Sequence, residues 1–349
     1  MPKYAILSNP GHNRVYFEAS KELSLSELSL ALDKLGCDYT EPKGEELGGI
    51  FYVCFSTVSA LSDEMLAALA RLSFVYAVFE LVGEEDRLLL SPVPLPEVLY
   101  MDGGLSSILK YSGKTNELFT RLMINAALLS SDFSTKEIRL LDPIAGKGTT
   151  LFEALSLGFD AYGAELSEKS VTDGFNYLKK FLETEKFKHT TSTEKINLQE
   201  KGLSAKRYCA DIARSKAEQK AGDTRHFELV AGNSMYADRY FKKNSFHLIV
   251  GDLPYGVQHG NVGAAKSGGS LTRSPKELIS SCGGAWYKVL KPGGALALSW
   301  NSFVYPREQF AAQLASLGFE VMSGGLYERF EHRVDQAIRR DLIIAKKPK

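Results

Sequence analysis

The sequence LLDPIAGKGTT occupies positions 140–150 and decides the fold of the larger part of the chain. An apolar run ends at Asp142, and a helix-forming stretch opens near Thr149. Between them, Gly146 and Gly148 permit a tight turn that brings the backbone close to a ligand. The N-terminus of the following helix would present free N–H groups and a partial positive charge to that ligand. The stretch therefore predicts a strand, a ligand-binding turn and a helix in succession.

Two details of this turn distinguish it from nucleotide-binding loops. The dinucleotide fingerprint has a third glycine where Thr149, Thr150 and Leu151 stand. The Gly-Lys-Ser/Thr sequence of a phosphate-binding loop is also missing. The turn therefore points to a different kind of cofactor.

Apolar runs and helical stretches alternate from Ile138 onward. The expected strands are residues 138–141, 160–165, 227–230, 248–251, 295–299 and 319–321. Alternation of this kind is typical of a mostly parallel sheet with helices on both faces. Segments 320–326 and 342–346 lie close together in the sequence, so a hairpin there would add an antiparallel C-terminal strand. The sequence predicts an α/β fold.

Residues 1–83 form a separate, small α+β unit. Strands are expected at 4–7, 49–55 and 74–82. Ser24 precedes an amphipathic helix that Gly36 can end, and Ser62 caps a second helix. The order β-α-β-α-β indicates a ferredoxin-like half or whole.

The boundaries of the linker, the second domain and an insertion follow from turn-forming residues and from segment lengths. Prolines and a Gly-Gly pair mark residues 84–112 as a linker, and the second domain would span 113–349. Within it, residues 167–226 form an insertion, since a strand–helix unit needs about half of that length. The middle of the insertion, residues 184–207, carries six Lys/Arg against three Glu. It is either a basic contact surface or a solvated helical insertion.

The turn at 142–149, Asp-Pro-x-Ala-Gly-x-Gly-Thr, resembles the first motif of class I S-adenosylmethionine-dependent methyltransferases. The resemblance implies a Rossmann-like methyltransferase sheet and S-adenosyl-L-methionine as the cofactor. In that family the Asp position contacts the methionine end of the cofactor and the glycine turn packs against it. Glu165, at the end of the next strand, would accept both ribose hydroxyls, and Asn233 would lie near the adenine. Helix capping is the alternative role of Glu165 and Asn233.

The helix that opens at residues 114–121 lies under the methionine moiety in methylases with this domain order. Thr115 is its expected N-cap, and Thr120 or Arg121 would reach the cofactor carboxylate; a plain packed helix is the alternative. The cofactor-binding residues that the resemblance implies are Asp142, Ala145, Gly146, Gly148, Thr149, Glu165, Asn233 and Thr120.

Positions 251–256 read GDLPYG and close the next strand. This stretch resembles the Asp/Asn-Pro-Pro-Tyr/Phe motif of amino-methyltransferases that act on adenine N6, cytosine N4 or guanine N2. An exocyclic amine is a poor nucleophile because its lone pair delocalises into the ring. Acceptors at its N–H groups localise that lone pair, and the Asp252 carboxylate and the Leu253 carbonyl would supply them. Tyr255 would stack on the base, worth about 1–3 kcal/mol.

The catalytic residues implied by this resemblance are Asp252, Leu253, Pro254 and Tyr255. Leu253 stands at the first Pro position of the motif, so the fixed φ of proline is lost there. The alternative is an Asp-x-Pro-Tyr turn without catalysis. The glycine-rich stretch 256–275 carries cations and no carboxylate, which suits a polyanionic substrate; a flexible surface loop is its alternative. The substrate-binding residues expected are Tyr255, His259, Lys266 and Arg273.

The domain order and Asp-Leu-Pro-Tyr-Gly resemble the tRNA guanosine-N2 methyltransferase group, the position-10, THUMP-related enzymes. The resemblance implies methylation of guanine N2 in RNA, with tRNA as the partner. A full-length THUMP RNA-binding domain normally follows the first unit of these enzymes, and the sequence leaves no room for one. Two alternatives stay open: a DNA adenine-N6 or cytosine-N4 methyltransferase, and a catalytically silent nucleic-acid-binding relative.

Composition limits the other possibilities. Lys plus Arg and Asp plus Glu both number 42, so nucleic-acid binding would depend on a local patch rather than on net charge. The four cysteines are scattered without a Cys-x-x-Cys or Cys/His cluster, so neither a metal site nor a disulfide framework is expected. Neither a signal sequence nor a run of about 18 apolar residues is visible. We expect a cytoplasmic protein without a metal or a membrane partner.

Overall fold

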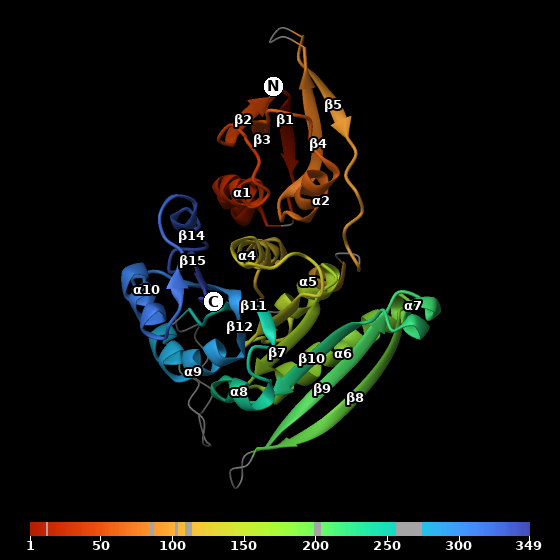
Figure 1. The fold of residues 1–349 in the computed structure, drawn as a ribbon, viewed down its shortest axis with the longest axis vertical. Coiled ribbons are helices and arrows are strands. Elements are labelled where there is room, and N and C mark those ends of the chain that lie inside the picture. Colours follow the sequence, from red (N-terminus) through yellow and green to blue (C-terminus); the bar gives the residue numbers. More distant parts are fainter. Residues whose placement is uncertain (12, 84–86, 102–103, 109–113, 199–203, 256–273) are drawn as a thin grey trace.

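The computed structural model describes residues 1–349 except 12, 84–86, 102–103, 109–113, 199–203 and 256–273. Its described residues form two sheets, a five-stranded sheet in the N-terminal domain and a ten-stranded sheet in the second domain (Figure 1). In the described residues, no helix combines the length and the apolar character that crossing a membrane requires.

The N-terminal domain has the ferredoxin-like arrangement. Its elements are β1 (Lys3–Ser8), α1 (Arg14–Lys34), β2 (Lys43–Leu47), β3 (Ile50–Ser56), α2 (Asp63–Arg71), β4 (Val75–Val82) and β5 (Leu89–Val93). The strand order is β2-β3-β1-β4-β5, and every neighbouring pair is antiparallel. Strand β5 pairs with β4 over five positions, so the first sheet extends beyond residue 83 into the predicted linker.

The first helix begins earlier than the sequence predicts. The Asn13 side chain accepts a hydrogen bond from the Tyr16 amide and caps α1, whereas Ser24 lies inside the helix and is buried. The buried face of α1 carries Ser20, Ser24 and Glu27, so its first turns lack the apolar spacing that marks an amphipathic helix. By contrast, Ser62 caps α2 as expected.

The second domain is an α/β sheet flanked by helices. Its elements are α3 (Gly104–Ser107), α4 (Glu117–Ser130), β6 (Arg139–Asp142), α5 (Thr149–Ser156), β7 (Asp160–Glu165), α6 (Glu168–Thr184), β8 (Lys188–Asn197), β9 (Ser204–Ala213), α7 (Lys216–Ala221), β10 (Arg225–Ala231), η2 (Ser234–Tyr236), α8 (Ala237–Tyr240), β11 (Phe246–Asp252), α9 (Pro275–Val289), β12 (Leu290–Asn301), α10 (Arg307–Ser316), β13 (Glu320–Val321), η3 (Gly325–Glu328), β14 (His332–Arg333) and β15 (Arg339–Lys346). The strand order is β13-β15-β12-β11-β6-β7-β10-β9-β8, with β14 paired to β15.

The central strands β10, β7, β6, β11 and β12 run parallel, and β15 is antiparallel to both β12 and β13. The predicted Rossmann-like methyltransferase sheet with an antiparallel C-terminal strand is confirmed. The chain reverses direction across the sheet at β6, because β6 lies between β7 and β11. Ligands of open α/β sheets bind at such switch points, beyond the carboxyl ends of the strands.

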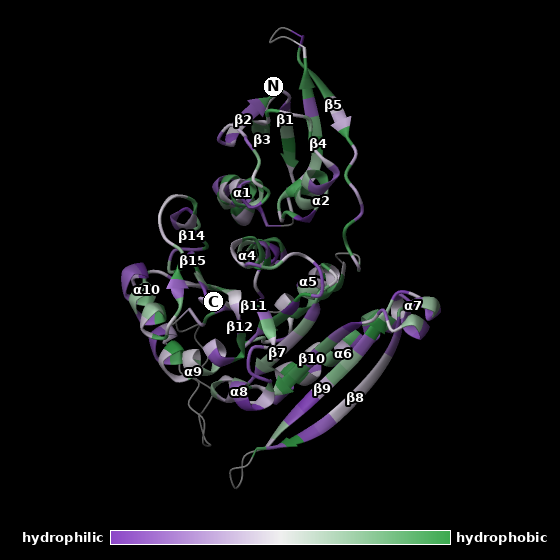
Figure 2. Cartoon of the chain, in the orientation of Figure 1, coloured by the Kyte–Doolittle hydropathy of each residue, from purple (hydrophilic) through white to green (hydrophobic). Residues whose placement is uncertain are grey.

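The insertion is a β-hairpin rather than a helical segment. Strands β8 and β9 pair antiparallel over ten positions, and β9 continues the sheet by pairing antiparallel with β10. Figure 2 shows hydrophilic colours along much of the hairpin, which forms the outer edge of the sheet beside β10. The preceding helix α6 is the ordinary connection between β7 and the next strands.

The two domains meet through α1 and α4, which lie side by side in Figure 1. Glu27 of α1 is completely buried at this junction. Its Oε1 accepts hydrogen bonds from the Ser73 amide at 3.0 Å and from Asn125 Nδ2 of α4 at 2.7 Å. Burial raises the pKa of Glu27. A polar contact thus joins the N-terminal domain to the helix that leads into the second sheet.

Candidate active site

The glycine turn lies where the sequence predicts it, at the end of β6. Gly146 and Gly148 have φ values of 55° and 98°, in the left-handed region that favours glycine. The Ala145 amide donates to the Ala164 carbonyl at 3.0 Å, which fixes the turn against β7. Thr149 is the buried first residue of α5, and no side chain caps this helix. The N-terminus of α5 therefore keeps the character of an anion- or dipole-binding turn.

Helix α6 contacts this turn closely through Gly174, a residue that the sequence analysis did not single out. A Cβ atom at Gly174 would lie 2.3 Å from the Lys147 carbonyl oxygen, so only glycine fits against the turn. Lys147 Nζ also pairs with Asp173 at 2.9 Å. The turn is thus supported by β7 on one side and by α6 on another.

Glu165 connects the turn to the end of β7. Its Oε2 accepts from the Gly146 amide at 3.0 Å and its Oε1 from the Ser167 amide at 2.8 Å. A carboxylate has about four acceptor positions, so two remain for a ligand. Asn233 has a local role: its side chain caps η2 by accepting from the Met235 amide at 3.0 Å.

Asp142 is buried at the carboxyl end of β6, with 3% of its surface exposed. Its Oδ1 accepts from the Ile144 amide at 3.0 Å. Burial raises the pKa of this carboxyl to about 7, and the nearby charges of Glu165 and Asp252 act in the same direction. Asp142 thus lies under the influence of carboxylates from the predicted cofactor side and the predicted transfer side.

The helix before β6 differs in detail from its prediction. Asn116, not Thr115, caps α4 by accepting from the Leu118 and Phe119 amides. Thr120 is fully buried and its hydroxyl donates to the Asn116 carbonyl at 3.0 Å, so it offers no exposed atom to a cofactor. Arg121 pairs with the buried Glu153 at 3.0 Å, so the Arg121 charge is engaged in an ion pair within the domain.

The Asp252 carboxylate is the centre of a hydrogen-bond cluster at the end of β11. It accepts from the Thr115 hydroxyl at 2.5 Å, from the Tyr255 hydroxyl at 2.7 Å and from the Ser299 hydroxyl. Arg340 Nη2 lies 3.8 Å from the same carboxylate. Besides Tyr255 of the motif itself, these partners come from the segment before α4, from β12 and from β15, so three distant segments converge on one acceptor.

Tyr255 is turned toward this cluster rather than presented as an open platform. Its hydroxyl donates to Asp252 and accepts from Arg340, whose guanidinium lies 5.2 Å from the ring centre. Burial and the Asp252 charge raise the pKa of Tyr255. The Tyr255 hydroxyl therefore occupies acceptor positions of the Asp252 carboxylate.

Leu253 has a physical reason to replace the first proline of the motif. Its amide donates to the Ser299 carbonyl at 2.8 Å, a hydrogen bond that proline lacks the N–H to form. Its side chain is 1% exposed and packs in the core beside β12. Pro254 follows with partial exposure. The loop loses the fixed φ of proline and gains a backbone link to the next strand.

Three predicted substrate residues, His259, Lys266 and Arg273, lie outside the described residues. Arg340 and Ser299 were missed by the sequence analysis. Both belong to strands whose pairing places them beside Asp252, and no local motif marks them. Arg340 is 6% exposed and also lies over the Phe119 ring at 4.7 Å.

A cluster that sequence spacing does not reveal lies on the neighbouring strands β9 and β10. The ligand atoms of Cys209, His226 and Glu228 lie within 4.8 Å of one another. His226 Nδ1 is already 2.7 Å from Asp211, and Glu228 Oε1 is 2.7 Å from Arg207 Nε. Burial opposes protonation of His226, but hydrogen bonds with its acidic neighbours outweigh it and raise the histidine pKa to about 10. The carboxylates of Asp211 and Glu228 thus pair with the cationic side chains of His226 and Arg207.

The model of the family described as UPF0020, RMKL-like, methyltransferase domain matches residues 121–295, which contain the glycine turn and the Asp-Leu-Pro-Tyr motif. No curated protein matches the chain.

Solved structures resemble the chain only distantly. TehB from Haemophilus influenzae has 13% identity and a TM-score of 0.35, and covers 64% of this chain. This chain spans 61% of the length of that TehB chain. An rRNA methylase from Streptococcus thermophilus has 12% identity and a TM-score of 0.35, with 68% of this chain and 100% of that chain covered.

The family match covers half of the chain and includes both motifs. The methyltransferase fold makes S-adenosyl-L-methionine the cofactor. The chain belongs to the RMKL-like methyltransferase domain family.

Proposed function

We propose that this methyltransferase alkylates the exocyclic amino nitrogen of a nucleobase in RNA, with guanine N2 of tRNA as the expected target. The observation that carries the proposal is the Asp252 carboxylate, which accepts hydrogen bonds from three hydroxyls at the carboxyl end of β11. That strand neighbours β6, where the glycine turn lies. An amine nucleophile needs a hydrogen-bond acceptor for its N–H groups close to the methyl donor. The Asp252 carboxylate accepts several donors and lies at the end of the strand next to the glycine turn.

The residues of the chain would act on the amine rather than on the cofactor. S-adenosylmethionine supplies an electrophilic methyl group when it is bound. Asp252 accepts a hydrogen bond from the amine and localises the nitrogen lone pair, and the Leu253 carbonyl is the second proposed acceptor. Positioning the amine in line with the methyl group provides most of the expected rate. Asp142, Gly146 and Glu165 are the proposed cofactor contacts.

Guanine is the base that suits a carboxylate best. Its N1–H and N2–H₂ groups lie side by side and both donate, and a carboxylate only accepts. Adenine presents the N1 acceptor beside its N6–H₂ donor, which an asparagine side chain would complement more fully. The acceptor-only character of Asp252 therefore favours guanine N2 over adenine N6.

Nucleoside mass spectrometry tests the proposal. The protein and S-adenosylmethionine are incubated with bulk tRNA, rRNA and DNA, and N2-methylguanosine in RNA is the expected product. Asp252→Ala should abolish methylation and leave the affinity for S-adenosylhomocysteine within a few-fold, because the carboxylate acts on the amine. Asp238→Ala is the matched control, since this aspartate pairs with Lys288 on α9.

Two results would refute the proposal. N6-methyladenosine in RNA or methylation of DNA alone would assign another base or another nucleic acid. Loss of cofactor binding together with activity in Asp252→Ala would give Asp252 a structural role.

A further inference from the structure

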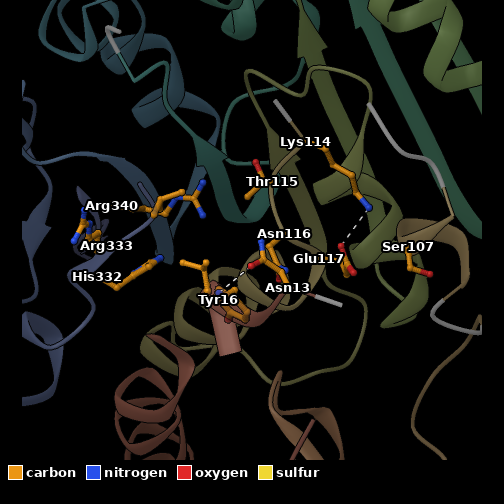
Figure 3. A pocket seen from close by; sticks show the side chains of 12 residues that line it. Asn13, Tyr16, Ser107, Lys114, Thr115, Asn116, Glu117, His332, Arg333 and Arg340 are labelled. Carbon is orange, nitrogen blue, oxygen red and sulfur yellow. Dashed lines mark hydrogen bonds and ion pairs between the residues drawn. The ribbon is translucent and has the colours of Figure 1, made fainter. Parts of the chain in front are cut away.

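A cavity of about 290 Å³ lies beside Asp252, between the two domains. Its walls come from the start of α1, the segment before α4 and the β14–β15 region, as Figure 3 shows. The polar lining residues used below are Asn13, Tyr16, Lys114, Thr115, His332, Arg333 and Arg340.

The cavity shares two of its lining residues with the Asp252 cluster. Thr115 and Arg340 both line it, and both contact the Asp252 carboxylate, at 2.5 Å and 3.8 Å. Arg340 is in β15, which is separated from β6 by β12 and β11. Glu165 is the last residue of β7, which lies on the other side of β6. The β15 wall of the cavity therefore lies on the β11 side of β6, opposite to Glu165.

The lining is rich in positive charge. Lys114, Arg333 and Arg340 line the cavity with a single carboxylate, Glu117, which Lys114 pairs at 3.2 Å; Arg340 also lies 3.8 Å from Asp252 at the edge of the cavity. Arg333 is exposed and, among the residues that the structure describes, has no carboxylate partner. Arg340 is nine-tenths buried, and its Nε has no hydrogen-bond partner in the described part of the chain. Cations placed in this way suit a phosphate group.

His332 adds an acceptor to the same wall. Its Nδ1 lies 3.0 Å from the Phe330 carbonyl, and because a carbonyl accepts, Nδ1 must carry the proton. Burial lowers the pKa of His332 to about 4, so the ring is neutral near pH 7 and Nε2 keeps a free lone pair. That Nε2 is buried and has no partner among the described residues. His332 Nε2 is thus a hydrogen-bond acceptor without a donor, next to the cations Arg333 and Arg340. A ligand that carries a hydroxyl next to a phosphate would complement both.

We propose that this cavity holds the ribose-phosphate of the RNA nucleotide whose base reaches Asp252. Arg333 and Arg340 face the phosphate, and His332 Nε2 accepts a hydrogen bond from the ribose 2′-hydroxyl. The N-terminal domain completes the wall through Asn13 and Tyr16, so both domains form the substrate site. The 2′-hydroxyl is the group by which a protein distinguishes RNA from DNA. The inference rests on the proposed RNA substrate and names the residues that recognise it.

The phosphate contact is tested by salt dependence. Binding of bulk tRNA to the full chain is measured over a range of KCl concentrations, for the wild type and for Arg333→Gln. One lost phosphate contact should reduce the slope of log K against log salt by about 0.7–0.9. Arg339→Gln is the matched control, because the neighbouring exposed arginine pairs with Glu331 at 3.1 Å and does not line the cavity. Equal slopes for the two variants would overturn the phosphate assignment.

The hydroxyl contact is tested by the ratio of RNA to DNA affinity. His332→Phe keeps a ring against Tyr16 and Phe119 and removes the acceptor. The affinity for tRNA relative to single-stranded DNA of the same sequence should fall by about fivefold or more, as expected for one unpaired polar group. An unchanged ratio in a variant that binds S-adenosylhomocysteine normally would overturn the assignment. If His332→Phe does not fold, Arg333→Gln still decides the proposal.

These outcomes are separable from the proposed function. Binding is measured without methyl transfer, whereas nucleoside mass spectrometry reports the reaction. Methylated guanosine together with equal salt slopes would refute the cavity assignment and leave the function standing. A smaller slope for Arg333→Gln than for Arg339→Gln, without methylated guanosine, would refute the guanine-N2 function and support the cavity assignment.

Discussion

The hydroxyl of Tyr255 lies 2.7 Å from Oδ2 of Asp252, at the acceptor that an incoming amine needs. Thr115 and Ser299 bond the same carboxylate, so its acceptor positions are shared among hydroxyls of the chain. An amine that enters must displace at least one of these donors. Tyr255 is the natural one to leave, because its ring is the proposed stacking surface for the base.

Substitutions of Tyr255 should separate these two roles. Tyr255→Phe removes the competing hydroxyl and keeps the ring, so kcat is expected within a few-fold of the wild type and KM for RNA unchanged or lower. Tyr255→Ala removes stacking worth about 1–3 kcal/mol, which corresponds to a fall in kcat/KM of about 5- to 150-fold. Steady-state kinetics check both variants. Equal inactivity of Phe and Ala would show that the hydroxyl itself takes part in the chemistry.

Glu165 should contribute to cofactor affinity in two ways. Its carboxylate holds the Gly146 amide in place and retains acceptors for the ribose hydroxyls. Glu165→Ala should weaken S-adenosylhomocysteine binding by about 1–3 kcal/mol for each buried group left unpaired. Calorimetry measures this change, with Glu168→Ala as a control, because Glu168 is exposed and pairs with Lys206 on β9. An affinity equal to that of the control would remove Glu165 from the cofactor site.

Asp142 predicts a pH dependence of stability. The pKa of its carboxyl is raised to about 7 in the folded chain, so the folded state binds the proton more tightly than the unfolded state. Its contribution is fully present below about pH 4 and is lost as the pH rises through 7. Asparagine does not titrate, so the difference in stability between Asp142→Asn and the wild type should shift in favour of the variant as the pH rises from 5 to 8. The comparison is made in the absence of cofactor. Melting temperatures at the two pH values test this, and a constant difference would contradict it.

His226 predicts a second pH dependence at a higher pH. Its folded pKa of about 10 exceeds the ordinary value of 6.5, because Cys209, Glu228 and Asp211 outweigh the effect of burial. The stabilisation is fully present below pH 6.5 and is lost as the pH rises toward 10. His226→Gln should destabilise the protein at pH 6 and have a smaller effect at pH 10. Chemical denaturation at both values measures the difference; an equal loss would show that packing, not charge, dominates.

The features that the sequence predicted correctly are set by short-range patterns. The glycine turn requires positive φ at Gly146 and Gly148, and the central strands are apolar runs that end in turn residues. Such signals lie within about ten residues of one another. They were sufficient to locate the central strands along the chain and to place Asp252 at the end of one of them.

The features that were missed depend on pairing between distant strands. Arg340 lies opposite Asn301 in the register of β15 and β12, and only that pairing brings it to Asp252. In the sequence, Arg339 and Arg340 are two adjacent surface-like charges, although one is exposed and the other buried. The β8–β9 hairpin was overlooked for a different reason. Strand β8 is polar, and its threonines favour a strand without the apolar alternation that usually reveals one. In β9, the alternating apolar residues Tyr208, Ala210 and Ile212 were not recognised as a strand.

The buried glutamate at the domain junction has a consequence for how the molecule comes apart. Glu27 of α1 is held by Ser73 of its own domain and by Asn125 of α4. Separating the domains would strip this side chain of the Asn125 hydrogen bond and expose the apolar faces of both helices. The ferredoxin-like domain and α4 should therefore lose hydrogen-exchange protection together, as one cooperative unit. Thr115 lies two residues before the first residue of α4 and donates to Asp252, so we expect opening of this unit to loosen the Asp252 cluster as well.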